Sequence, residues 1–212
     1  MKITALTVGP VGTNCYLVSD GNGDAAVIDP GAEGRRILAC IAEEGLTPKA
    51  ILLTHGHFDH IGAVGALQKA FGIPVYIHTD DLEMLSDGEK NGSFAFGFPE
   101  AVVSGAQALS DGETVRAGEL AFTLIHTPGH SKGSCCYRCG GVLFTGDTLF
   151  DGGVGRTDLY GGSGRELTAS LKKLAGLPGD YQVDPGHGGF TTLAAQRAEN
   201  PYMGMNGYDD LF

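Results

Sequence analysis

Short continuous runs of apolar residues alternate along this chain with runs in which apolar residues recur every three or four positions. The continuous runs at 50–53 and 75–77 are bounded by Gly, Pro or polar residues, a pattern that is typical of buried β-strands. The spaced residues Ile37, Leu38 and Ile41 predict an amphipathic helix, because this spacing places their side chains on one face. The alternation of strand and helix predicts an α/β fold.

The same patterns predict the remaining elements. Helices are expected from Ile61 to Gly72, from about Thr79, from a capping box at Ser163 to Gly176, and from about Thr192 to Asn200. Strands are expected within residues 1–30, 107–126, 134–138, 142–145 and 181–184. The sequence shows no repeat, low-complexity tract or linker, so residues 1–212 are interpreted as a single domain.

The segment from Ser86 to Pro99 interrupts this alternation. It is rich in Gly, Ser, Asn and charged residues, yet it contains Phe94, Phe96 and Phe98. A loop of this length is usually a lid, a binding loop or disordered, and disordered segments are normally poor in aromatic residues. Two interpretations follow: a loop whose aromatic side chains contact the apolar part of a substrate, or a strand with one buried face.

Composition narrows the class of protein. The chain has 42% hydrophobic and 18% charged residues, as globular proteins do, and a net charge of −11 at pH 7. This acidity argues against nucleic acid as a partner. The N-terminal residues resemble a strand rather than a signal peptide, and the apolar runs are too short to span a membrane. Five cysteines do not suggest a disulfide framework, and the expected location is the cytoplasm.

Candidate metal ligands are concentrated between one predicted strand and the helix that follows it. His55, His57, Asp59 and His60 fall within six positions. Alternate side chains of an extended segment point the same way, so the first three can converge on one pocket, which His60 enters from the first helical turn. Imidazole and carboxylate ligands suit zinc, iron or manganese. This loop is predicted to bind metal.

The pattern His-x-His-x-Asp-His after a buried strand resembles the signature of the metallo-β-lactamase superfamily. Four later segments match that family in the same order and extend the resemblance to about residue 201: Thr127–His130, Gly146–Thr148, Gly155–Asp158 and Pro185–Gly188. Within the family, the chain looks most like small hydrolases similar to glyoxalase II. The resemblance implies a four-layer αβ/βα sandwich with the metal site at one edge of the sheets.

The resemblance also implies ligands for two divalent metal ions, zinc in the first instance, with iron or manganese as alternatives. The implied ligands form a first group, a second group and a bridging residue: His55, His57 and His130; Asp59, His60 and His187; and Asp147. Two cations about 3.5–4 Å apart repel each other, and a bridging carboxylate and a bridging hydroxide offset that repulsion. Asp59 is also the expected catalytic residue, as an acceptor for the hydroxide that attacks the substrate.

Other polar and thiol residues have more ordinary interpretations. Asp29 is either an outer partner of the metal ligands, as the resemblance implies, or a turn residue. His78 and His126 are interpreted as packed or hydrogen-bonded side chains rather than ligands. Cys135 and Cys136 are adjacent on a predicted strand and therefore face opposite ways, which disfavours a shared metal ion and favours burial.

A small-molecule thioester is the expected substrate. Two metal ions can supply a hydroxide and polarise a carbonyl, and a leaving thiol with a pKa near 8.5 needs little help from an acid. Esters and lactones release more basic alkoxides. Glyoxalase II enzymes bind glutathione through basic residues of a C-terminal helical region, whereas Arg197 is the only basic residue after His187. This difference, together with the apolar and acidic tail 201–212, argues against glutathione as the thiol.

Three basic residues remain as candidate contacts to an anionic substrate: Lys132, Arg156 and Arg165. Arg156 is equally suited to tying its own loop in place. The principal rival function is a persulfide dioxygenase with a single iron held by His55, His130 and Asp147. A lactone or ester hydrolase of the same fold is a further alternative.

Three other classes are disfavoured. A secreted β-lactamase would have a signal peptide, and those dizinc enzymes would be expected to have a cysteine at position 147. A flavodiiron oxidoreductase would typically have Glu at position 57. A non-catalytic binding protein would not need all seven ligand positions filled.

Overall fold

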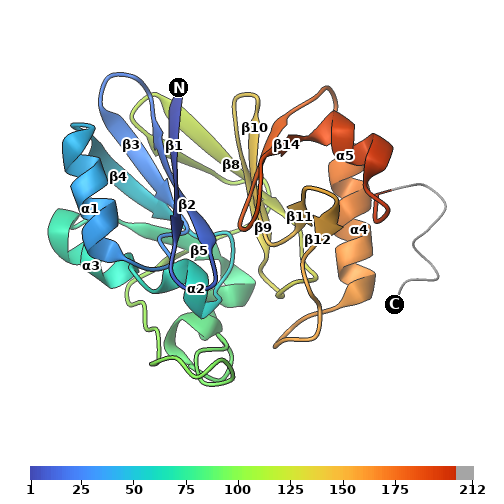
Figure 1. Ribbon diagram of the computed structural model, residues 1–212, viewed down its shortest axis with the longest axis horizontal. Coiled ribbons are helices and arrows are strands. Elements are labelled where there is room, and N and C mark those ends of the chain that lie inside the picture. Colours follow the sequence, from blue (N-terminus) through green and yellow to red (C-terminus); the bar gives the residue numbers. More distant parts are fainter. Residues whose placement is uncertain (204–212) are drawn as a thin grey trace.

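The structure, a computed structural model, describes residues 1–203, which form four layers in the order helices, sheet, sheet, helices (Figure 1). The helices α1 (Gly34–Glu43) and α3 (Val64–Phe71) cover one outer face. The helices α4 (Gly164–Ala175) and α5 (Leu193–Glu199) cover the other. The predicted α/β class and four-layer αβ/βα arrangement are therefore confirmed.

The first sheet is built from the N-terminal half of the chain and has the strand order β1-β2-β3-β4-β5-β6. Its strands are Lys2–Val8, Thr13–Ser19, Asp24–Ile28, Thr47–Leu52, Val75–His78 and Gln107–Leu109. The strands β1 to β3 are antiparallel neighbours, and β3 to β6 run parallel. Because β3, β4 and β5 run parallel, the loops that follow them leave the sheet at the same edge.

The second sheet has the strand order β14-β13-β10-β9-β8-β7. In chain order from β7 to β10, and then β13 and β14, its strands are Thr114–Ala117, Leu120–His126, Cys135–Cys139, Val142–Gly146, Gln182–Pro185 and Thr191–Thr192. The strands β8 and β10 are both antiparallel to β9, and β13 is parallel to β10. The loops after β8, β10 and β13 therefore leave the sheet at one edge. The short strands β11 (Leu149–Phe150) and β12 (Gly153–Val154) form a separate hairpin.

Alternating side chains divide the buried residues among three cores, one at each interface between layers. In β2, Cys15 and Leu17 belong to the core under α1 and α3. Tyr16 and Val18 of the same strand belong to the core between the two sheets. Leu143 of β10 belongs to the core under α4. Strands that contribute to two cores need apolar residues at every position, which explains the continuous apolar runs in the sequence.

The helix predicted to begin at Ile61 is instead two helices, α2 (Phe58–Ile61) and α3, which are separated at Gly62. A Cβ atom on Gly62 would lie 2.3 Å from the carbonyl oxygen of Gly31 in the loop after β3. This close approach of two backbones interrupts the helix. The local spacing of apolar residues contains no sign of it.

The segment between η1 (Thr79–Ser86, a 3₁₀ helix) and β6 forms turns and extended loop, not the strand that was one of its two interpretations. The buried Asn91 holds this segment at its base, because its Nδ2 donates to the carbonyls of Met84 and Ala101 at 3.1 and 2.9 Å. Its Oδ1 accepts from the N–H and the hydroxyl of Ser93. Residues 87–99, called the 87–99 loop below, lie on the same side of the fold as α2 (Figure 1).

Two other sequence expectations concern the membrane and the tail. Within residues 1–203, no helix is long and apolar enough to cross a membrane. The apolar and acidic tail lies outside the described residues from position 204 onward.

Candidate metal centre

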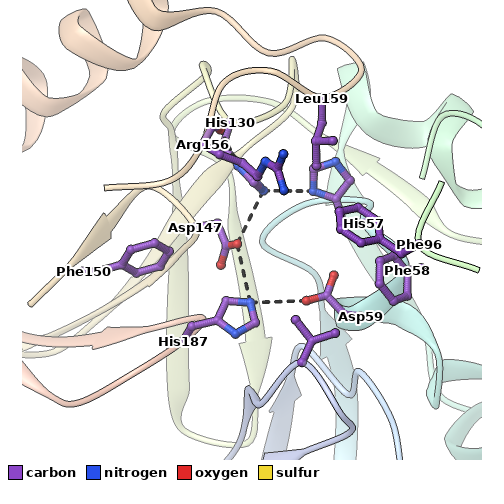
Figure 2. A pocket seen from close by; sticks show the side chains of 11 residues that line it. His57, Phe58, Asp59, Phe96, His130, Asp147, Phe150, Arg156, Leu159 and His187 are labelled. Atoms are coloured by element: carbon purple, nitrogen blue, oxygen red, sulfur yellow. Dashed lines mark hydrogen bonds and ion pairs between the residues drawn. The ribbon is translucent and has the colours of Figure 1, made fainter. Parts of the chain in front are cut away.

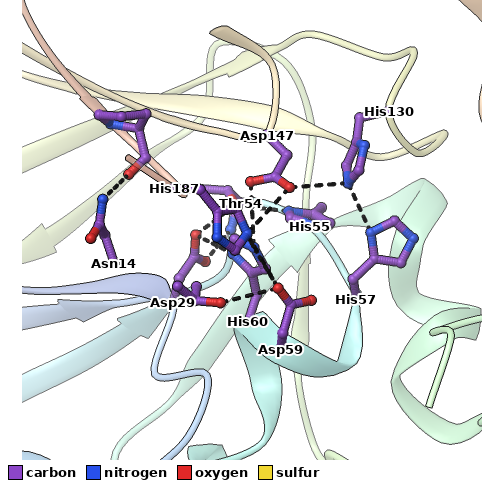
Figure 3. Close-up of polar contacts among 12 residues, drawn as sticks. Asn14, Asp29, Thr54, His55, His57, Asp59, His60, His130, Asp147 and His187 are labelled. Atoms are coloured by element: carbon purple, nitrogen blue, oxygen red, sulfur yellow. Dashed lines mark hydrogen bonds and ion pairs between the residues drawn. The ribbon is translucent and has the colours of Figure 1, made fainter. Parts of the chain in front are cut away.

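Seven histidine and aspartate side chains gather where the strand ends of the two sheets meet (Figure 3). The loop after β4 and the helix α2 supply four of them: His55, His57, Asp59 and His60. The loops after β8, β10 and β13 supply the other three: His130, Asp147 and His187. Each loop starts where a buried strand ends, so the packed sheets fix the start of each loop. The structure thus brings together all seven side chains that the sequence suggested as ligands.

The first group consists of three imidazoles in mutual contact. The rings of His55, His57 and His130 pack edge to face, with centroids 4.8, 4.7 and 4.6 Å apart. Nδ1 of His57 lies 2.9 Å from Nε2 of His130. Two nitrogens bound to one tetrahedral zinc ion would lie about 3.3 Å apart, given zinc–nitrogen bonds of about 2.0–2.1 Å. The spacing of these rings is therefore compatible with one ion.

The second group has a similar spacing. Nε2 of His187 lies 3.2 Å from Oδ2 of Asp59, and Nε2 of His60 lies 3.4 Å from Nε2 of His187. Asp147 lies between the groups, with Oδ1 3.5 Å from Nε2 of His60. Its Oδ2 lies 3.5 Å from the Nε2 atoms of both His130 and His187. One carboxylate is therefore positioned to contact ions in both groups.

Buried polar atoms without partners are concentrated in this cluster. Within residues 1–203, four buried side-chain nitrogen or oxygen atoms lack a hydrogen-bond partner, and three of them are Nε2 of His55, Nε2 of His57 and Oδ1 of Asp147. Each such atom costs about 1–3 kcal/mol when it is left unsatisfied, so native proteins retain few of them. Cations held through Nε2 of His55 and Oδ1 of Asp147 would remove this cost at those two atoms. Imidazole and carboxylate donors fit divalent metal ions, so the site fits the metal that the sequence implied.

The protonation states also suit cation binding. Burial lowers the pKa of His55 and His57 well below its ordinary value, so both rings are neutral, which is the form that binds metal. Burial acts the same way on His60, but the nearby carboxylates, with Asp59 the strongest, outweigh it and raise its pKa to about 10. A proton on His60 therefore balances the carboxylates when no metal is bound, and a cation can replace that proton.

Asp29 supports the cluster from the end of the first sheet (Figure 3). Its carboxylate accepts from the N–H of Thr54 at 2.8 Å, from the Thr54 hydroxyl at 2.6 Å and from Nδ1 of His60 at 2.9 Å. The Thr54 hydroxyl also lies 3.1 Å from Nδ1 of His55. These bonds engage the Nδ1 atoms and leave the Nε2 atoms of both rings for metal. Asp29 is therefore an outer partner of the candidate ligands His55 and His60.

Asp81 is a supporting residue that the sequence did not indicate. It is buried in η1 and accepts from the N–H groups of Gly56 and Gly133 at 2.9 and 2.6 Å. It also accepts from the hydroxyl of Ser131 at 2.6 Å. These bonds join the loop after β4, which carries His55 and His57, to the loop after β8, which carries His130. The only signal in the sequence is an acidic residue on the inward side of a predicted helix.

The start of β2 supplies two further supporting residues without a sequence signal. The Thr13 hydroxyl donates to Oδ2 of Asp59 at 3.0 Å. Nδ2 of Asn14 donates to two backbone carbonyls, at 3.1 and 3.0 Å, in the loop that carries His187. β2 therefore orients ligands of the second group from both sheets.

A cavity of about 330 Å³ opens over the cluster (Figure 2). Its floor includes His57, Asp59, His130, Asp147 and His187. Its apolar walls consist of Val11, Phe58, Phe96, Phe150 and Leu159. Figure 2 shows Phe58 and Phe96 on one side of the cavity and Phe150 on the other. An apolar organic group can therefore lie directly above the metal-binding atoms.

The three phenylalanines of the 87–99 loop lie in different places. Phe96 lines the cavity, and its ring centroid is 5.5 Å from that of Phe58. Phe98 stacks on Phe58, with ring centroids 4.8 Å apart, and lines a neighbouring cavity. Phe94 packs against Gly88 and lines neither cavity. A direct substrate contact is therefore open to Phe96 and Phe98 but not to Phe94, because the loop turns instead of extending.

The three basic candidates also differ, and Arg165 lines neither this cavity nor its neighbour. Arg156 lines the cavity, 5.8 Å from the ring centroid of Phe96, while its guanidinium donates to both oxygens of Asp158 at 2.6 and 2.7 Å. It therefore both ties its own loop and faces the cavity. Lys132 lies outside the cavity lining, and its ammonium group sits 4.9 Å from the centroid of the Tyr160 ring. Lys132 is therefore a surface contact between loops, not a contact in this cavity.

The remaining histidines and cysteines lie outside the cluster. His78 and His126 stack with ring centroids 3.8 Å apart and planes 9° from parallel. Lone pairs lie in the plane of an imidazole, so those of the two rings lie in two nearly parallel planes and do not converge well on a shared ion, and Nε2 of His126 lies 2.9 Å from the carbonyl of Lys132. Cys135 belongs to the core between the sheets and Cys136 to the core under α4, so they face opposite ways as predicted. Burial raises the pKa of the Cys136 thiol to about 11.

Comparison with known proteins identifies the family. Residues 8–187 match the sequence profile of the Metallo-beta-lactamase superfamily, a span that contains every member of the cluster. The chain belongs to the metallo-beta-lactamase superfamily. The resemblance in the sequence is thereby confirmed. Membership of the metallo-beta-lactamase superfamily, together with the ligand cluster, supports a metal-dependent hydrolase that binds a divalent metal.

Relatives in the metallo-beta-lactamase superfamily match the chain from end to end. The probable metallo-hydrolase YqgX of Bacillus subtilis (strain 168) is 40% identical over 213 residues, which are 98% of this chain and 99% of YqgX. The hydroxyacylglutathione hydrolase GloC of Haemophilus influenzae is 35% identical over 208 residues, 96% of this chain and 98% of GloC.

Crystal structures show the same fold. BLEG-1, a B3 metallo-beta-lactamase, has a TM-score of 0.91 and 40% identity, covering 95% of this chain and 99% of BLEG-1. TTHA1623, in a di-iron-bound form, has a TM-score of 0.84 and 42% identity, covering 94% of this chain and 99% of TTHA1623. The metallo-beta-lactamase superfamily fold is thus matched over nearly the whole chain.

Proposed function

We propose that this protein hydrolyses small-molecule thioesters with two divalent metal ions, zinc in the first instance. The observation that carries the proposal is the position of Asp147, which lies within 3.5 Å of ligand nitrogens in both groups. The likeness to the hydroxyacylglutathione hydrolase GloC supports the reaction class. The likeness to TTHA1623 in a di-iron-bound form supports two ions and keeps iron as an alternative.

The residues around the cluster have distinct tasks in this reaction. When bound, two cations would lower the pKa of a shared water and polarise the substrate carbonyl. Within residues 1–203, Asp59 makes its contacts through Oδ2, to Thr13, His60 and His187. Its Oδ1 can therefore accept a hydrogen bond from the attacking water and fix its direction. Phe58 and Phe96 exclude bulk water from one side of the cavity.

The cavity favours thioesters over esters and lactones. Apart from the metal cluster, Arg156 is the only side chain with a polar hydrogen in the cavity lining, and its guanidinium is too weak an acid to give up that proton. No side chain of this lining is thus free to protonate a basic alkoxide. A thiolate leaves without such help, because its conjugate thiol has a pKa of about 8.5.

The cellular setting is also part of the proposal. All five cysteines are unpaired, and reducing compartments keep thiols in that state. We place the reaction in the cytoplasm with a small molecule as the partner. The net charge of −11 opposes binding of nucleic acid.

Release of free thiol tests the reaction class. The zinc-loaded protein is expected to release thiol from a panel of lactoyl thioesters that includes S-lactoylglutathione, measured with a thiol reagent. Oxygen uptake with glutathione persulfide is expected to be negligible. The likeness to BLEG-1 makes β-lactam hydrolysis a second candidate, so a β-lactam belongs in the panel. Rapid oxygen uptake, or β-lactam cleavage, without thioester cleavage would replace the proposal by that activity.

Metal content tests the two-ion arrangement. The purified protein is expected to hold two ions per chain, measured by elemental analysis. His130→Ala should empty chiefly the first site and His187→Ala the second, because each removes one ligand of a separate group. His78→Ala is the control and should retain both ions, since His78 stacks outside the cluster. One tightly held iron, with no second ion under metal-replete conditions, would favour the dioxygenase.

Phe96→Ser is expected to raise KM about tenfold with little loss of stability. Its side chain is 44% exposed at the cavity, and covering about 50 Å² of apolar surface with substrate contributes roughly 1.3 kcal/mol. Phe94→Ser is the matched control, because Phe94 is 49% exposed and lines neither cavity. Steady-state kinetics and thermal unfolding measure both effects. A cooperative loss of folding with unchanged kinetics in the surviving protein would place Phe96 in the core.

A further inference from the structure

A second cavity of about 340 Å³ lies beside the metal cavity. The β1–β2 turn, the loop after β3 and the segment 98–101 enclose it. Val11, Phe58 and Asp59 line both cavities, so the two share a wall. The two cavities therefore lie side by side, and a molecule whose reactive bond lies over the metal cluster would enter the second cavity by extending past Phe58.

The charged groups of the second cavity have one sign. Its charged lining residues are Glu33, Glu100 and Asp59, and its lining contains no Lys, Arg or His. Oε1 of Glu33 accepts from the N–H of Gly9, and its Oε2 pairs with Arg36, which does not line the cavity. This pairing offsets part of the charge of Glu33.

Glu100 keeps its charge uncompensated. Its Oε1 accepts from the N–H of Gly88 at 3.1 Å, and no cationic side chain within residues 1–203 pairs with it. The remaining walls are apolar or backbone, with Val8, Phe58 and Phe98 among them. This combination attracts an organic group that is uncharged or positively charged and repels an anionic one.

Outside the metal cluster, the metal cavity offers little positive charge to a polyanionic substrate. Its one basic residue outside the cluster is Arg156, and Asp158 accepts from Nε and Nη2 of that guanidinium. The reacting carbonyl and water would engage the ions bound in the cluster, so a thiol with several carboxylates or phosphates would lose water without gaining an unpaired cationic side chain in either cavity.

We propose that the second cavity binds the thiol half of the substrate and selects thiols that are uncharged or carry an ammonium group over polyanionic thiols. This inference rests on the proposed thioesterase activity. The carbonyl has to lie over the metal cluster, and the thiol carrier, as the larger half of a small acyl thioester, needs the additional volume.

Binding of unreactive thioethers tests the inference without turnover. The zinc-loaded protein is titrated calorimetrically with S-ethylcysteamine, its uncharged N-acetyl derivative and S-ethylglutathione. The ammonium and uncharged thioethers are expected to bind at least about fivefold more tightly than the glutathione derivative. Both glutamates are exposed to solvent, so each charge contributes roughly two- to fivefold.

Substitutions then assign the preference to this cavity. The double variant Glu33→Gln, Glu100→Gln keeps one acceptor oxygen at each position, for the N–H groups of Gly9 and Gly88, and should weaken binding of S-ethylcysteamine roughly three- to tenfold while leaving the N-acetyl derivative unchanged. The double variant Glu43→Gln, Glu119→Gln removes the same charge from exposed positions outside the cavity and should change neither.

Three results overturn the inference, two from binding and one from turnover. One is tighter or equal binding of S-ethylglutathione by the parental protein. The other binding result is an equal change in the affinity for S-ethylcysteamine in the double variant at Glu33 and Glu100 and in the control variant at Glu43 and Glu119. Hydrolysis of all lactoyl thioesters with KM independent of thiol charge would also overturn it, while the proposed function stands. If binding follows the expected order and no thioester is cleaved, the preference of the cavity is confirmed and the proposed function is wrong.

Discussion

Asp59→Asn is expected to lower kcat by about two orders of magnitude and to change KM much less. The variant keeps the shape of the side chain and one oxygen ligand but loses the negative charge. Thr13 and His187 hold Oδ2 of Asp59 in place, which leaves Oδ1 to direct the attacking water. A displacement of the attacking group by about 1 Å can cost on the order of a hundredfold in rate. Substrate binding depends on the cavity walls, so KM responds less.

Comparison of Asp59→Ala with Asp59→Asn separates the effect of the negative charge from the effect of metal ligation. It removes both oxygens, so the second metal should be lost, whereas the Asn variant retains part of it. Metal content measured beside steady-state kinetics distinguishes the two variants. Asp24→Asn is the matched control, because Asp24 pairs with Lys49 on the exposed surface and should keep the parental values. Two metals and near-parental kcat in Asp59→Ala would show that this residue neither ligates nor orients the water.

Asp29→Ala is expected to weaken zinc binding about 10- to 100-fold and to destabilise the metal-free protein by roughly 3 kcal/mol. The carboxylate accepts three hydrogen bonds, two from Thr54 and one from His60, and its loss leaves buried donors unsatisfied. It also frees the rings of His55 and His60 to rotate or change tautomer, which lowers their affinity as ligands.

Asp29→Asn is the informative companion variant. Asp29 has φ of 47°, a left-handed conformation that Asn adopts nearly as readily as Asp. The substitution therefore adds no backbone strain. The amide nitrogen of Asn would replace either Oδ1, where it would face the N–H of Thr54, or Oδ2, where it would face both the Thr54 hydroxyl and Nδ1 of His60. Zinc affinity should therefore fall nearly as far as in Asp29→Ala, with a smaller loss of stability. Chelator competition and urea unfolding measure the two effects. Parental zinc affinity in both variants would make Asp29 a turn residue only.

The sequence predicted the features of this site that are local. His55, His57, Asp59 and His60 fall within six positions after an apolar run, so their convergence follows from strand geometry alone. The later ligands were placed through family resemblance, since nothing local joins His187 to a loop more than 100 residues earlier.

Features that depend on distant contacts were not predicted. The break at Gly62 results from packing against Gly31, and the role of Asp81 results from two loops that meet only in the folded chain. The even spacing of Phe94, Phe96 and Phe98 suggested one shared face. Turns anchored on the buried Asn91 send the three rings to different surroundings instead.

The division of ligands between the sheets turns each ion into a cross-link. In both groups, two ligands come from the first sheet and the third, His130 or His187, comes from the second. The core between the sheets therefore sets the distance between ligands that come from different sheets. In that core, the ring centroids of Tyr16 and Phe144 lie 5.2 Å apart. A substitution in that core changes the distance between the ligands that an ion has to bridge. It does so although the substituted residue contacts no ligand. The choice of metal can thus shift through residues buried well away from it.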